Sequence, residues 1–107
     1  MSNSTELSDR ISKVLESKYI PYEIKRFGGF SYFMTGGKVI AAAVNANMLV
    51  KCKPEMLNEI LKQPNTQTVP DAAGEPQKDM FLVDSEAIET EEALIKFLEI
   101  GLSYADK

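Results

Sequence analysis

Residues 26–44 decide the fold, and they read Arg-Phe-Gly-Gly-Phe-Ser-Tyr-Phe-Met-Thr-Gly-Gly-Lys-Val-Ile-Ala-Ala-Ala-Val. Two diglycines, at 28–29 and 36–37, bracket an aromatic-rich segment, and paired glycines between apolar segments are typical of tight hairpin turns. Phe27 is expected to supply an apolar anchor for the first turn. The apolar run 39–44 is too short to span a membrane and predicts a central strand covered on both faces.

The sequence on either side extends this meander and adds three helices. Residues 22–26 and 48–52 are predicted strands, the first because apolar and polar residues alternate. Apolar residues at helical spacing predict helices over 6–18, from Pro54 onward, and after a cap at Thr90. Residues 63–77 are predicted to be mostly loop, with a short strand near Thr68 as an alternative. Residues 79–83 are the last clear predicted strand.

These elements predict one α+β domain over residues 1–107. Its two layers are an antiparallel sheet of about five to six strands and three helices, in the order helix, β-meander, helix, one or two strands, C-terminal helix. A chain of 107 residues has room for one hydrophobic core. We see no linker or internal repeat that would divide it.

The net charge and the distribution of apolar residues limit which partners the chain is expected to bind and where in the cell it is expected to be. Acidic residues outnumber basic ones by 16 to 12, which gives a formal charge of −4. Direct nucleic-acid binding is therefore disfavoured, because Lys and Arg supply most of the affinity for phosphates. The polar start lacks the features of a signal peptide and no apolar run is long enough for a membrane span, so we expect a cytoplasmic protein without membrane contact.

Few residues are suited to catalysis or metal binding. There is no histidine, and Cys52 is the only cysteine, so the usual nucleophile–base pairs and transition-metal ligand sets are missing. Lys51 and Lys53 would favour the Cys52 thiolate, yet Cys52 ends an apolar strand and we favour a buried, inert thiol. The sequence predicts no enzyme, no cofactor and no metal site.

Six short motifs follow one another along the chain in a recognisable order. They are Arg26-Phe27-Gly28-Gly29-Phe30, Gly37-Lys38, Leu49-Val50-Lys51, Gly74-Glu75-Pro76-Gln77-Lys78, Phe81-Leu82-Val83-Asp84, and the hydrophobic end from Leu98 to Ala105. The series resembles the N-terminal domain of the TfoX/Sxy family over about residues 5–105. The chain departs from that pattern at Arg26, where the family usually has Met, and at Gln77 and Asp79, where it has Met and Gly.

The resemblance implies a two-layer α+β domain and a homodimer. Longer family members add a C-terminal domain and regulate natural competence, so the resemblance also implies a regulatory role. These 107 residues are expected to hold only the counterpart of the N-terminal domain, so the regulatory role is not simply transferred to them.

Basic residues near the first glycine turn form one candidate ligand site. Consecutive glycines expose backbone N–H groups that can hold an anion, so Gly28 and Gly29 are candidate ligand-binding residues together with Arg26. Lys51 and Lys78 would complete a basic pocket if their strands are neighbours of that turn. The alternative is that the glycines only allow the bend and that the lysines are solvated.

The final helix carries a wider apolar surface than one face of a small sheet requires. Phe97, Ile100 and Tyr104 are therefore the candidate dimer-interface residues, with burial in the monomer core as the alternative. Our first functional hypothesis is a non-enzymatic regulatory or interaction module that acts as a homodimer and recognises a protein partner. The second is a small anion- or phosphate-metabolite-binding domain, which would include a cryptic enzyme.

Overall fold

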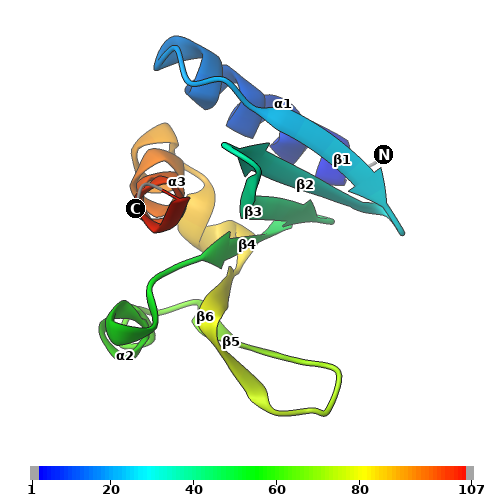
Figure 1. Cartoon of the computed structure of the whole chain (residues 1–107). Coiled ribbons are helices and arrows are strands. Elements are labelled where there is room, and N and C mark those ends of the chain that lie inside the picture. Colours follow the sequence, from blue (N-terminus) through cyan, green and yellow to red (C-terminus); the bar gives the residue numbers. More distant parts are fainter. Residues whose placement is uncertain (1–2, 106–107) are drawn as a thin grey trace.

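A computed structural model describes residues 3–105 and shows three helices packed on a six-stranded antiparallel sheet (Figure 1). The elements are α1 (Asn3–Ser17), β1 (Glu23–Phe27), β2 (Phe30–Thr35), β3 (Lys38–Val44), β4 (Asn47–Lys51), η1 (Pro54–Met56), α2 (Leu57–Ile60), β5 (Thr66–Pro70), β6 (Pro76–Val83), η2 (Ser85–Ile88) and α3 (Glu91–Ala105). The strand order is β1-β2-β3-β4-β6-β5. The predicted α+β class, the layers and the order of elements are confirmed.

Both diglycines form the predicted hairpin turns. Gly28 and Gly29 have φ of 59° and 85°, the doubly positive conformation of a tight two-residue turn that side chains with a Cβ resist. They join Phe27 to its direct cross-strand partner Phe30. Phe27 itself is 77% exposed, so its predicted role as a buried anchor is wrong: the turn needs the glycines and not an apolar contact beneath Phe27.

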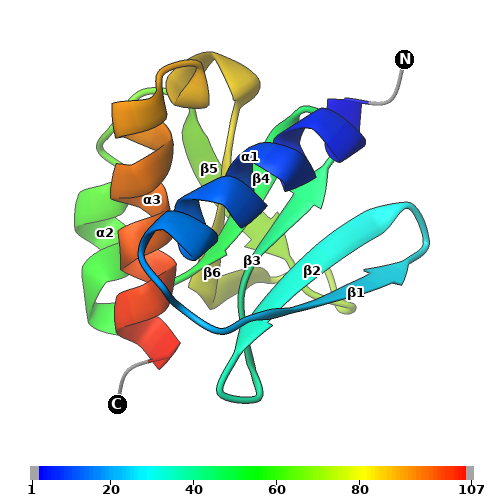
Figure 2. The ribbon, with the colours of Figure 1, turned by 90° about the horizontal axis from the view of Figure 1, so that it is seen from above.

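The register of the strands sets the inner face of the sheet. Phe33 on β2 is level with Ala41 on β3, Val50 on β4 and Phe81 on β6, and all four are buried. They point toward the helices, and Figure 2 shows α1 and α3 crossing over the strands. The core also includes the helix residues Leu7, Ile11, Val14, Leu15, Leu57, Ile60, Leu94, Phe97 and Leu98.

A β-bulge brings α3 close to the sheet. Phe33 pairs with Ala41 and Met34 with Val39, which leaves Ile40 without a partner. The backbone of Ile40 lies directly under α3 at Gly101, where an added Cβ would come within 2.5 Å of the Ile40 carbonyl oxygen. Glycine at this position therefore permits the close approach of helix and strand, although it weakens the helix itself.

Three further predictions from the sequence can be compared with the structure. Thr90 caps α3, since its Oγ1 accepts a hydrogen bond of 3.1 Å from the backbone N–H of Ala93. The strand left open near Thr68 is present as β5. Residues Ile40 to Ala43 of β3 are buried on both faces, as predicted, although the helices α1 and α3 pack on one side of the sheet and neighbouring strands cover Ala42 on the other. Within residues 3–105 no helix is long and apolar enough to cross a membrane.

Ser8 offers the first test of this packing. Its side chain is 1% exposed, and its hydroxyl has no hydrogen-bond partner among the described residues. We expect Ser8→Ala to raise the free energy of unfolding by about 1 kcal/mol, because it removes an unsatisfied buried group and favours the helix. Urea denaturation measures the change.

Ser103→Ala, at an exposed position of α3, is the matched control for helix propensity alone. A loss of stability in Ser8→Ala would show that the hydroxyl has a partner and would contradict the packing described for α1.

Candidate functional site

The side of the sheet that faces away from the helices has an apolar centre. We call it the open face and define it by residues that alternate with the core residues along the strands. Its apolar members are Phe27, Phe30, Tyr32, Met34, Ala42, Val44, Leu49, Met80 and Leu82. Apart from exposed Phe27 and buried Ala42, each of these is partly exposed. By register, the charged residues Glu23, Lys25 and Lys51 lie on the same face, opposite Met34, Tyr32 and Met80.

This pattern differs from that of a sheet with one solvated face. Such antiparallel sheets usually alternate apolar residues toward the core with polar residues toward water. Here β2 places Ser31 and Phe33 inside and Phe30 and Tyr32 outside. Because the outer positions of β2 are as apolar as its inner ones, this part of the open face has the composition typical of an interaction surface.

The centre of the open face is well packed. Tyr32, Ala42, Leu49 and Leu82 are level with one another on β2, β3, β4 and β6. Ala42 is only 1% exposed and lies outside the core cluster. Its larger cross-strand partners Tyr32 and Leu49 flank it on either side.

Aromatic side chains gather on the β1–β2 half of this face. The rings of Phe30 and Tyr32 lie 5.9 Å apart between centroids, tilted by 57°. Phe27, opposite Phe30 in the register, extends the group to the hairpin turn. Aromatic residues and Met are enriched in protein interfaces, and a large exposed ring supplies much apolar area with few rotatable bonds.

Charged residues of both signs lie on the open face at its edge strand β1 and at the far end of β4. Glu23 and Lys25 alternate with Ile24 on the edge strand β1. At the far end of β4 the Lys51 ammonium lies 2.9 Å from the Asp79 carboxylate. The same ammonium lies 5.1 Å from the centre of the Tyr104 ring. No single sign of charge dominates this rim.

The predicted basic pocket is not assembled. Lys51 and Lys78 do lie on the neighbouring strands β4 and β6, but Arg26, Gly28 and Gly29 belong to β1 and its turn, and β2 and β3 separate them from β4. Strands lie about 4.8 Å apart, so Arg26 is three strand spacings, roughly 14 Å, from β4.

The surroundings of the two lysines also disfavour an anion. Lys51 is already paired with Asp79. Lys78 lines a groove at the β5–β6 hairpin that also carries Asp71, Glu75 and Asp79. These carboxylates would repel a phosphate or carboxylate ligand.

The predicted interface on α3 is partly inside the monomer. Phe97 is 4% exposed, and its ring centroid lies 6.0 Å from that of the core residue Phe81. Its assignment to a dimer interface is therefore corrected: the inner face of β6 covers it. Ile100 is partly buried beside Met56 and Ile60, and Tyr104 faces Lys51. The wide apolar surface of α3 packs against both the sheet and the α2 region.

Cys52 lies at the end of β4 and is fully buried. Burial raises the pKa of its thiol, the nearby Asp79 carboxylate raises it further, and Lys51 acts in the opposite direction. The neutral thiol is thus the favoured form, which is the state expected of an inert cysteine.

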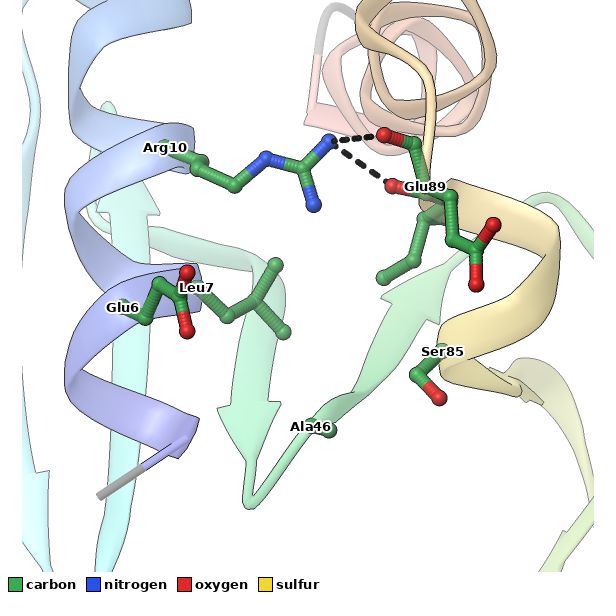
Figure 3. Close-up of a pocket in the computed structure, with 7 residues that line it drawn as sticks. Glu6, Leu7, Arg10, Ala46, Ser85 and Glu89 are labelled. Carbon is green, nitrogen blue, oxygen red and sulfur yellow. Dashed lines mark hydrogen bonds between the residues drawn. The ribbon is translucent and has the colours of Figure 1, made fainter. Parts of the chain in front are cut away.

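A pocket between α1 and η2 is the remaining polar feature (Figure 3). Arg10 reaches across it and donates a hydrogen bond of 2.7 Å to the Ile88 carbonyl oxygen and a longer one of 3.4 Å to that of Glu89. Its guanidinium also lies 3.8 Å from the Glu91 carboxylate. Arg10 thereby ties α1 to the start of α3, which is a structural role.

Metal ligation has no support in the described part of the chain. Within residues 3–105 no group of three or more Cys, Asp or Glu side chains is placed to hold a metal ion. No family model, curated protein or solved structure matches this chain. The open face is therefore the candidate site on geometry and composition alone.

Proposed function

We propose that this chain is a non-enzymatic regulatory or interaction module that binds protein through the open face. The observation that carries the proposal is the apolar centre of the open face, which the described helices leave uncovered. A protein surface is the natural cover for such a face, because it supplies matching apolar area without requiring a charge of one sign.

The resemblance to the N-terminal domain of TfoX/Sxy regulators supports the regulatory part of this proposal. It rests on the ordered motifs from Arg26-Phe27-Gly28-Gly29-Phe30 to the hydrophobic C-terminal helix. An anion-binding function has less support, since its basic residues lie on separate parts of the sheet.

Affinity capture from a lysate of the source cells tests the proposal. The tagged chain is compared with Leu49→Lys, which places a charge at the centre of the open face, and with Ser103→Lys, which places the same charge at an exposed position of α3. We expect mass spectrometry to identify protein retained by the original chain and by Ser103→Lys and lost from Leu49→Lys.

Circular dichroism of both variants must first show an unchanged fold. Identical capture by all three proteins would contradict the proposed function, because the open face would then contribute nothing to binding.

A further inference from the structure

We infer that the outer edge of β1 binds an acidic, extended segment of a partner protein, which adds to the sheet as a further strand. This assignment rests on the proposed function, because the added strand would extend the aromatic half of the open face beyond Lys25 and Phe27. The partner is defined by its chemistry: acidic residues face Lys25 and Arg26, and apolar residues lie on either side of them.

The backbone of β1 carries unpaired groups along its outer edge. β1 is the first strand of the sheet and pairs only with β2 in the described chain (Figure 2). Phe27 and Phe30 close a two-residue turn and so form a hydrogen-bonded pair, after which bonded and non-bonded pairs alternate along the strand. The N–H and C=O groups of Ile24 and Arg26 therefore point away from β2, and no other described segment bonds to them. An added strand binds to such groups.

The two edges of the sheet differ in how readily they accept a further strand. On β5 the pairing with β6 shifts between Thr68 and Pro70, and Pro70 has no N–H group. Bulges and prolines protect an edge against pairing. By contrast, the five residues of β1 pair with β2 in unbroken register and include no proline. The β1 edge is therefore the one that a strand can extend regularly.

The charges on β1 favour an acidic partner. Lys25 and Arg26 are exposed, and neither forms an ion pair with a described residue. Lys25 lies on the open face, opposite Tyr32, and Arg26 lies on the helix side, opposite Ser31. Acidic residues at two successive positions of an added strand would meet both charges, one on each face. Basic residues on an edge commonly prevent pairing, but these would repel a basic strand and attract an acidic one.

Apolar side chains flank these two charges. Phe27 is 77% exposed on the open face, and Ile24 is partly buried against the core on the other side. Because Phe27 is hydrogen-bonded to β2, it would form a non-hydrogen-bonded pair with the added strand, in which facing side chains come closest. Glu23, at the start of β1, favours a basic residue opposite it. An antiparallel partner therefore reads apolar, acidic, acidic, apolar, basic.

A synthetic peptide of that pattern, Thr-Val-Glu-Glu-Val-Lys-Thr, tests the site on the purified full chain. Amide hydrogen exchange followed by NMR reports on each backbone N–H separately. We expect the peptide to slow exchange at Ile24 and Arg26, whereas Lys25 and Phe27, whose N–H groups already bond to β2, should change little. The dissociation constant should lie below about 1 mM.

A second peptide with lysine in place of both glutamates is the control for charge. It should bind at least about 10-fold more weakly, because its lysines would face Lys25 and Arg26. The net charge of the chain, −4, would favour this basic peptide at most other places on the surface. A preference for the acidic peptide is therefore specific to the edge of β1.

Three variants separate the charges from the backbone, and their NMR spectra show whether each keeps the fold. Lys25→Glu with Arg26→Glu should weaken the acidic peptide at least about 10-fold and reverse the preference to the lysine peptide. Lys13→Glu with Lys78→Glu makes the same change in net charge at exposed positions of α1 and β6, and should leave binding within about three-fold. Arg26→Pro removes an outward N–H and should abolish the protection at Ile24.

Three outcomes would overturn the inference. Unchanged exchange at Ile24 and Arg26 with excess acidic peptide would show that no strand adds to β1. Equal binding of the two peptides would show that the charges on β1 do not select the partner. Protection at β5 would place the added strand at the other edge. In each case the proposed function stands as long as protein capture depends on Leu49, so the two proposals fail separately.

Discussion

Replacing Gly101 with valine is expected to lower the free energy of unfolding by about 3 kcal/mol or more. The reason is the contact between α3 and the bulge of β3, where even a single added carbon would lie 2.5 Å from the Ile40 carbonyl oxygen. The two nearest atoms are the backbone carbonyl oxygen and carbon of Ile40, so no side-chain rotation relieves the clash. Urea denaturation followed by circular dichroism measures the loss.

The matched control is Ser103→Val, two residues further along the same helix at an exposed position. It introduces the same β-branched side chain and should cost less than about 1 kcal/mol, which is the helix-propensity effect alone. Equal effects at Gly101 and Ser103 would mean that α3 does not approach Ile40 closely. Gly101→Ala should fall between the two, because its gain in helix propensity offsets part of the clash.

Local sequence signals predicted most of the fold for physical reasons. The diglycines at 28–29 and 36–37 allow the positive φ angles of tight turns, and those turns fix which strands are neighbours in the meander. The apolar spacing of Leu7, Ile11 and Val14 marks the buried side of α1 correctly, since a helix presents residues three and four apart on one face.

The candidate site depended on information that is not local. Whether Arg26 could meet Lys51 depends on the strand order β1-β2-β3-β4-β6-β5, and that order arises from pairing between segments far apart in the chain. The same holds for Phe97, whose apolar character fits either an interface or a core. Only the position of β6 beneath α3 shows that Phe81 covers it.

A signal for the open face was nevertheless present in the sequence. In residues 30–34 and 48–50 nearly every position is apolar, whereas a strand with one solvated side alternates with polar residues. We expected double cover for residues 39–44 only. Extending that reasoning to β2 and β4 would have predicted a second apolar face, although it could not have shown that the described helices leave this face free.

Replacing Phe81 with alanine should lower the free energy of unfolding by about 3–5 kcal/mol. Phe81 is fully buried on the inner face of β6 and contacts Phe97 of α3, with the ring planes inclined by 55°. Removing the ring leaves a cavity between sheet and helix that the surrounding core only partly fills. Because this packing lies within one copy of the chain, the loss should be the same at every protein concentration.

Its neighbour Leu82 provides the contrasting case, because it points to the open face from the same strand. Leu82 is only partly buried, so Leu82→Ala should lower the free energy of unfolding by less than about 2 kcal/mol. It should therefore melt close to the original chain, whereas Phe81→Ala should melt at a clearly lower temperature. Differential scanning fluorimetry compares the three proteins. Equal losses in the two variants would contradict the placement of Phe81 on the inner face of the sheet and of Leu82 on the open face.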